Sequence, residues 1–218
     1  MAHRLLPFRQ YDENDVVNLY AVDLTTGPDL NTTKPAVDGN NADGVVVRVS
    51  NGTIGDDVID VSNVSDQFMA TYSSPVGRNP YPVNPLKVVA AGSGDANAVL
   101  GVTLNQTLQI DENRESLLFN PVKKDELQAV LSGQTVPVLA KGVVTFTEEA
   151  YGGADSSVDM LPGNSLVLST NDGKIEGYAG TAKAGEVRIG TILATGNRES
   201  LTSTDSWAGA YFVCKIDC

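Results

Sequence analysis

Apolar and polar residues alternate over short segments along most of the chain, a period of two that is typical of half-buried β-strands. The clearest case is residues 210–216, where Phe212, Cys214 and Ile216 fall on one face. Strands are expected at residues 15–22, on both sides of a turn within 45–61, and at 87–91, 99–104, 136–146, 166–169, 174–178, 186–193 and 210–216. This pattern predicts an all-β fold.

Two short polar segments between these strands carry the residues of tight hairpin turns. Asn51 and Gly52 separate two β-branched runs, and Asn-Gly readily adopts the positive φ angles of a type I′ turn. Thr170, Asn171, Asp172 and Gly173 have the same character. Each segment therefore predicts a β-hairpin.

Two other segments interrupt the strand pattern. Residues 26–44 are so rich in Gly, Pro, Asn and Asp that a loop is expected. Residues 73–86 contain Pro75, Pro80, Pro82 and Pro85, which remove backbone donors and predict a stiff connector. We expect an N-terminal arm (1–14), a smaller β region (15–86), and a C-terminal domain (87–218) that forms a small β-barrel or β-sandwich.

One helix is expected within the C-terminal domain. Asn120 is a candidate N-cap, and Pro121 sits where its missing N–H costs nothing. Leu127, Val130 and Leu131 form an apolar stripe before Gly133, which is expected to end the helix. Such a helix would plug an open barrel end or cover a sheet edge.

Composition limits the possible partners. The formal net charge is −12, and a surface this acidic repels the phosphates of nucleic acid. No stretch approaches the roughly 18–20 apolar residues that span a bilayer, and the opening segment is too short and too interrupted for a secretion signal.

Cys214 and Cys218 would lie about 13 Å apart in a strand, which exceeds disulfide reach. Free thiols and a reducing cytoplasm are expected.

The residues needed for catalysis or metal binding are sparse. His3 is the only histidine and lies near a terminus, so we expect no catalytic site and no enzyme. Residues 38–44 match a calcium loop at too few ligand positions, and Asp56, Asp57 and Asp60 suit a solvated surface. The glycine-rich segment 179–196 lacks the Lys-Ser/Thr ending of a phosphate-binding loop. No metal or cofactor is expected.

The order of motifs from residue 99 to the end of the chain is distinctive. The segments, in order, are GVTLNQTL (101–108), GQTVPVLAKGVVTF (133–146), MLPGNSLVLSTNDGKIEGYA (160–179), AGEVRIGTILATG (184–196) and AYFVCKI (210–216). This order resembles the capsid decoration, or cement, proteins of tailed bacteriophages. Turn positions of that pattern match Gly142, Pro162, Gly163, Gly173 and Gly190. The opening residues are also similar to those of virion structural proteins of marine and cyanobacterial phages.

The resemblance implies a non-enzymatic virion protein, synthesised in the host cytoplasm, that binds the outer capsid surface and bridges major capsid subunits. Copies would associate as trimers or dimers. Within the opening segment, an apolar cluster flanked by cations suggests a clamp on the capsid or on a neighbouring copy, with large apolar side chains supplying the binding energy. The interface residues expected on this hypothesis are His3, Arg4, Leu5, Leu6, Pro7, Phe8, Arg9 and Trp207.

Other interpretations stay open at this point. The apolar residues of the opening segment could instead fold onto the core of their own chain. The protein could be another virion part, such as a tail, collar or fibre-base protein, because one β module serves many assemblies. A carbohydrate-binding β-sandwich on the particle surface is a further alternative, although Trp207 is better placed as a core or interface residue than as a sugar platform.

Overall fold

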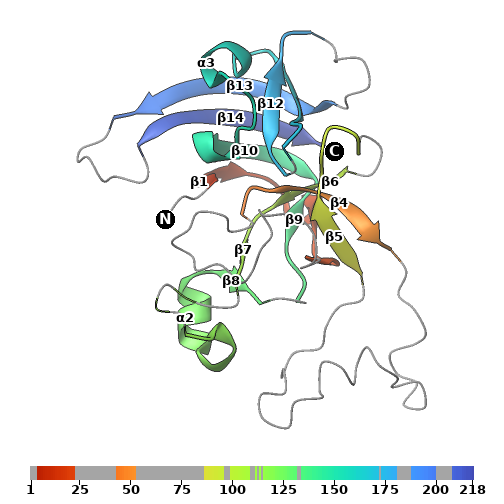
Figure 1. Cartoon of the computed structure of the whole chain (residues 1–218), viewed down its shortest axis with the longest axis vertical. Coiled ribbons are helices and arrows are strands. Elements are labelled where there is room, and N and C mark those ends of the chain that lie inside the picture. Colours follow the sequence, from red (N-terminus) through yellow and green to blue (C-terminus); the bar gives the residue numbers. More distant parts are fainter. Residues whose placement is uncertain are drawn as a thin grey trace.

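The computed structural model describes residues 4–22, 43–52, 86–95, 99–108, 111, 113, 115–131, 134–171, 173–180, 188–199 and 208–218. Within these residues the chain is built mainly of β-strands with a few short helices, which confirms the all-β fold (Figure 1). The helices are α2 (Pro121–Glu126) and α3 (Ser156–Asp159), with 3-10 turns η1 (Glu13–Asp15), η5 (Leu117–Phe119) and η6 (Glu148–Ala150). No helix in the described ranges is long and apolar enough to cross a membrane.

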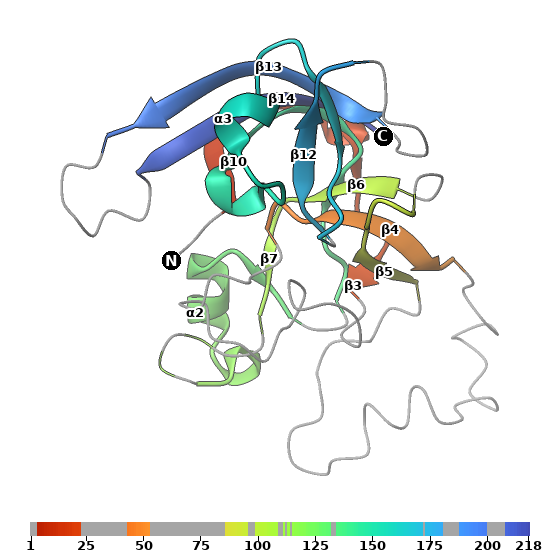
Figure 2. The ribbon, with the colours of Figure 1, turned by 45° about the horizontal axis from the view of Figure 1, so that its top comes forward.

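The first sheet has six antiparallel strands in the order β1-β10-β14-β13-β11-β12. These strands are β1 (Leu5–Gln10), β10 (Lys141–Thr147), β14 (Gly209–Asp217), β13 (Arg188–Arg198), β11 (Ser165–Leu168) and β12 (Ile175–Tyr178). The sheet is strongly curled, and its long strands β13 and β14 extend past the others as a two-stranded ribbon (Figure 2). β1 forms one edge of this sheet.

The second sheet also has six strands, in the order β2-β9-β6-β4-β5-β3. They are β2 (Val16–Val17), β9 (Val138–Leu139), β6 (Val99–Thr103), β4 (Val46–Asn51), β5 (Lys87–Ala90) and β3 (Ala21–Val22). A small separate pair, β7 (Gln106–Thr107) with β8 (Ala129–Val130), lies beside α2.

The main hydrophobic core lies between the two large sheets. Leu5, Phe146 and Phe212 from the first sheet pack in one cluster with Val46 and Leu139 from the second. The other face of the second sheet is buried too, in a cluster formed by Val22, Val45, Val47, Val88, Ala90, Val130, Val136 and Val138. The β-branched residues of β4 therefore alternate between two cores, as a central strand covered on both faces requires.

The sheets do not follow the boundary expected at residue 86. Strands β2, β3 and β4, from the N-terminal side of that boundary, share a sheet with β5, β6 and β9 from its C-terminal side. Residues 5–10 of the expected arm form β1 and pair with β10. The physical reason is that backbone hydrogen bonds are satisfied between strands that are distant in sequence, so the two regions complete one another's sheets.

Several strand predictions are confirmed, with local differences. In β14, Phe212, Cys214 and Ile216 are buried, as the alternation predicts. The strand expected at 136–146 is divided at Ala140 into β9 and β10, and the strand expected at 15–22 is divided into β2 and β3. β4 ends at Asn51, and the partner expected for the hairpin at Asn51 and Gly52 lies outside the described residues.

The hairpin predicted at residues 170–173 is confirmed and also joins the two sheets. Leu168 of β11 pairs with Ile175 of β12 across the turn. Gly173 has a φ of 78°, and its N–H and carbonyl bond to Ala91 O and Val46 N at 2.8 and 3.1 Å. A Cβ at this position would lie 2.6 Å from Val45 Cγ1, so glycine is required both for the turn and for the contact.

The helix is shorter than the sequence predicts. Asn120 and Pro121 occupy the expected N-cap and first positions, although the Asn120 side chain makes no capping hydrogen bond. The helix ends at Glu126, because Gln128 adopts a φ of 50° and turns the backbone out of the helix. Val130 then lies in strand β8, so the helix does not continue to Gly133. The apolar residues predicted to form one face of the helix therefore lie after its end, and Val130 belongs to a strand.

The two cysteines are free, as expected from their spacing. Cys214 is buried in the main core, and burial raises the pKa of its thiol to about 12. A buried thiol with such a pKa stays protonated and packs as a small apolar group.

A large bulge interrupts the pairing of β1 with β10. Leu5 pairs with Phe146 and Arg9 pairs with Val144, so Leu6, Pro7 and Phe8 together face Thr145. The extra residues push the edge strand outward at this point. The Thr145 hydroxyl oxygen is buried and has no hydrogen-bond partner among the described residues.

We expect Thr145→Val to stabilise the protein by about 1 kcal/mol, because valine has the same shape without the unpartnered hydroxyl. The free energy of unfolding from urea denaturation measures the effect. Thr147→Val, on the same strand and only partly buried, serves as the comparison. A loss of stability in Thr145→Val would mean that the hydroxyl has a partner after all.

Candidate functional site

The structure separates the expected interface residues into two groups. Leu5 and Leu6 are buried in the protein itself, with Leu5 in the main core at 2% exposure, and Arg4 is buried beside them. These residues therefore do not form the surface of a clamp, because their apolar area is already used within the chain. His3 and Trp207 lie outside the described residues.

The remaining residues of the opening segment reach the surface. Phe8 is 62% exposed, Pro7 is exposed, and Arg9 is partly exposed. The bulge against β10 explains the difference, since it turns Phe8 away from the core while Leu5 stays in register with Phe146. Of the large apolar side chains expected at the interface, Phe8 is the one that lies exposed among the described residues.

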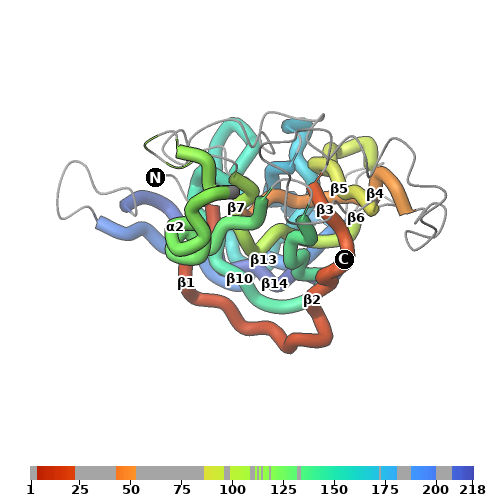
Figure 3. The backbone as a smooth tube through the Cα atoms, turned by 90° about the horizontal axis from the view of Figure 1, so that it is seen from below, coloured from red at the N-terminus to blue at the C-terminus, as the bar shows by residue number. Residues whose placement is uncertain are grey.

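A groove of about 710 Å³ runs along β1, between that strand and the unit formed by β7, β8 and α2. The backbone course of β1, β7 and α2 can be followed in Figure 3. Its volume falls in the range of ordinary small-molecule sites. The lining residues come from four separate segments, and they are Leu5, Pro7, Arg9, Gln10, Tyr11, Asp43, Leu104, Asn105, Gln106, Leu127 and Gln128. We call this site the β1 groove.

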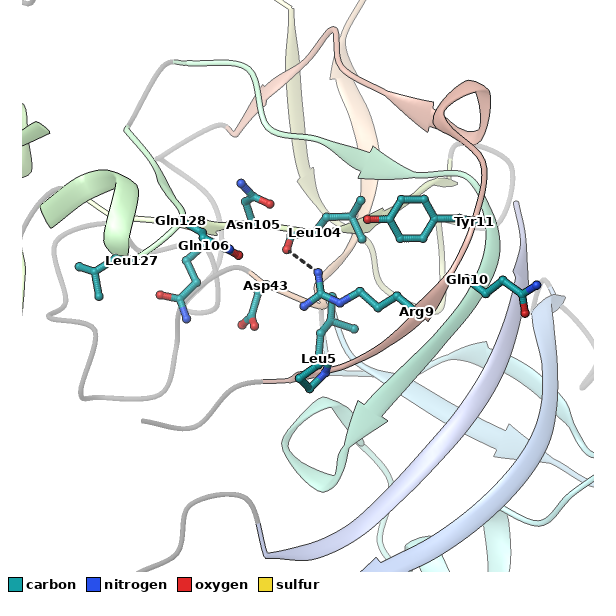
Figure 4. Close-up of a pocket in the computed structure, with 11 residues that line it drawn as sticks. Leu5, Arg9, Gln10, Tyr11, Asp43, Leu104, Asn105, Gln106, Leu127 and Gln128 are labelled. Atoms are coloured by element: carbon teal, nitrogen blue, oxygen red, sulfur yellow. Dashed lines mark hydrogen bonds between the residues drawn. The ribbon is translucent and has the colours of Figure 1, made fainter. Parts of the chain in front are cut away.

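Arg9 extends across the β1 groove (Figure 4). Its Nε donates to Leu6 O at 3.2 Å, which ties the two ends of the bulge together. Its Nη1 donates to Leu104 O at 3.4 Å, which connects β1 to the segment between β6 and β7. Arg9 thus fixes the shape of the groove and presents a positive charge within it.

The polar lining consists chiefly of side-chain amides. Asn105 and Gln128 each offer both N–H donors and a carbonyl acceptor. Gln106 is buried at 4% exposure, and the Gln10 side chain points away from the other lining residues (Figure 4). Tyr11, which is 40% exposed, adds an aromatic ring and a hydroxyl. Beside the charged Arg9 and Asp43, the groove therefore offers uncharged hydrogen-bonding groups next to an aromatic surface.

Gln128 follows the end of α2 and lines the β1 groove. It follows the C-cap residue Leu127, and its N–H donates to Asp125 O at 3.1 Å. Its φ of 50° makes it the one non-glycine residue with positive φ among those described. Glycine or asparagine usually occupies this position after a helix, because other side chains are strained there.

A second polar cluster surrounds Tyr151, which directly follows η6. The Tyr151 hydroxyl donates to Asp159 Oδ2 at 2.5 Å and accepts from Asp155 N at 3.1 Å. Burial, followed by the hydrogen bond to Asp159, raises the pKa of Tyr151. Asp155 caps α3 by accepting from Ser157 N at 3.0 Å, and Ser157 holds the pKa of that carboxyl below its usual value. These bonds attach α3 to the sheet and leave little free hydrogen-bonding capacity.

Within the described ranges, no group of three or more His, Cys, Asp or Glu side chains is arranged to hold a metal ion. Residues 38–42 of the segment compared with a calcium loop, and Asp56, Asp57 and Asp60, lie outside those ranges.

Comparison with known protein families, curated proteins and solved structures found no match to the chain.

Sequence reasoning missed most of the β1 groove. Asp43 was visible as part of a polar loop, but nothing in its neighbourhood indicated contact with β1. Asn105 and Gln106 sit at the end of a predicted strand with no motif around them. Gln128 could have been found only if the helix end had been placed correctly, because the signal is a side chain where glycine is expected.

Proposed function

We propose that this protein is a structural component of a phage virion, which binds the outer surface of the capsid and holds neighbouring major capsid subunits together. Supporting this are the order of motifs from residue 99 onward and the all-β fold that those motifs imply. The protein would be made in the host cytoplasm and would act without catalysis. Trimers at three-fold positions, or dimers at two-folds, would multiply weak contacts into stable attachment.

The observation that carries the proposal is Phe8. A large aromatic side chain stands 62% exposed on an edge strand whose neighbouring leucines are buried. Burying such a side chain against a partner stabilises the contact by about 1.5–3 kcal/mol. The formal charge of −12 keeps free copies apart until a complementary surface is present.

The test is addition of the purified protein to expanded heads and to precursor heads, with bound copies counted by gel densitometry and cryo-electron microscopy. We expect saturable binding to expanded heads only. Phe8→Ser should weaken that binding roughly ten- to hundredfold, the equivalent of one buried aromatic side chain, while leaving the melting temperature unchanged.

The matched control is Phe119→Ser, which makes the same change at another exposed phenylalanine, on η5. Equal loss of binding in both variants would show that Phe8 is not the specific contact. Absence of binding to any head would refute the capsid proposal. Mass spectrometry of tail-less heads against whole particles then distinguishes a capsid protein from a tail, collar or fibre-base protein.

A further inference from the structure

The residue that carries the proposed capsid contact, Phe8, is not among those that line the β1 groove. The shape and lining of this groove require a separate explanation. We propose that the β1 groove binds a short neutral oligosaccharide. This inference does not depend on the capsid proposal, since it concerns the isolated protein.

The lining of the groove matches the chemistry of a sugar. Each sugar hydroxyl can both donate and accept a hydrogen bond, and the accessible amides of Asn105 and Gln128 can do the same. The exposed ring of Tyr11 provides a flat apolar surface for the C–H face of a pyranose. Convergence of such groups from separate segments on one concave surface is typical of ligand sites.

The backbone of Gln128 supplies a second, independent argument. At φ 50° after the end of α2, glycine would relieve the strain, yet the chain places there a side chain that lines the groove. Residues held in disfavoured backbone conformations are concentrated at functional sites. A ligand that bonds the Gln128 amide would explain why this side chain is present.

An extended peptide fits the groove less well. Peptides commonly bind to a sheet by adding a strand to its free edge through backbone hydrogen bonds. In β1 that edge is blocked in three ways: the bulge disrupts its register, Pro7 has no N–H, and Leu6 O already accepts from Arg9. Recognition in the groove must therefore come from side chains.

A phosphate or another anion also fits less well. Arg9 provides the guanidinium of the groove, and it already donates to two backbone carbonyls. Asp43 places a carboxylate in the same lining. With a formal charge of −12 for the whole chain, the surroundings disfavour an anionic ligand.

The test is binding of the full-length protein to an array of neutral oligosaccharides built from hexose, N-acetylhexosamine and deoxyhexose units. The best ligand is then titrated by saturation-transfer NMR and calorimetry. We expect Gln128→Gly and Tyr11→Ala each to weaken binding about tenfold or more. Gln128→Gly should melt at or above the wild-type temperature, which separates loss of binding from loss of fold.

Two controls isolate the groove. Asn197→Ala removes an exposed amide from β13, outside the lining, and Phe8→Ser removes the proposed capsid contact. Both should bind the sugar as the wild type does. Gln128→Gly should in turn still bind expanded heads wherever the wild type does, so the two proposals can fail separately.

Three results would overturn the inference. The first is the absence of any neutral sugar that binds. The second is sugar binding that survives both Gln128→Gly and Tyr11→Ala, because the site would then lie elsewhere. The third is selection, from a displayed library, of a peptide whose binding depends on Gln128, since the groove would then be a peptide site.

Discussion

Phe146→Ala is expected to lower the free energy of unfolding by about 3–5 kcal/mol. Phe146 is fully buried in β10, where it pairs with Leu5 on one side and Phe212 on the other. Its ring therefore lies in the part of the core where the N-terminal and C-terminal strands meet. Urea denaturation followed by circular dichroism and tryptophan fluorescence measures the loss.

The matched control is Phe8→Ala, which makes the same change at an exposed position on β1. It should alter the unfolding free energy by no more than about 0.5 kcal/mol. If both variants lose similar stability, the packing of β1 differs from the one described. If Phe146→Ala costs less than about 1 kcal/mol, Phe146 is not a core residue.

Deletion of residues 2–10 is expected to lower the free energy of unfolding of the isolated protein by at least about 3–6 kcal/mol. This is the stabilisation that the burial of Leu5 and Leu6 alone provides. It also removes strand β1 and uncovers the edge of β10, which then offers unpaired backbone groups to other copies. We expect a lower melting midpoint and, by size-exclusion chromatography, concentration-dependent association.

A double variant, Pro7→Ala with Phe8→Ser, is the control for this deletion because it changes the bulge but keeps both buried leucines. It should remain monodisperse and close to wild type in stability. A truncated protein that melts at the wild-type midpoint would show that β1 contributes nothing to the fold. Because the deletion perturbs folding, it cannot test attachment, and the single change at Phe8 is the better probe.

The strand pattern of the sequence was informative where burial is one-sided. In β14 the alternation assigned Phe212, Cys214 and Ile216 to the core correctly, because each face of that strand has a different environment. The turn at residues 170–173 was equally clear, since Gly173 supplies a backbone conformation that few residues tolerate. Local chemistry sufficed in both places.

Other features depend on contacts that local chemistry does not encode. The apolar stripe at Leu127, Val130 and Leu131 fitted a helix, but pairing of Ala129 and Val130 with Gln106 and Thr107 made the second half a strand. From the sequence, the opening segment could pack on a partner or on the core of its own chain. Only its pairing with β10 shows that Leu5 and Leu6 are buried within the chain. The β1 groove combines four sequence segments, so no single motif could reveal it.

The pairing of β1 with β10 also determines when this protein can fold during its synthesis. Residues 5–10 are made before β10, so Leu5 must wait for Phe146, and translation at about 5–20 residues per second makes that delay roughly 7–28 seconds. The sheet then still lacks β14, which inserts between β10 and β13 and follows every other described strand along the sequence. Until β10 is made, Leu5 and Leu6 lack their native core partners and are exposed on the nascent chain, where apolar side chains of this kind are binding sites for chaperones.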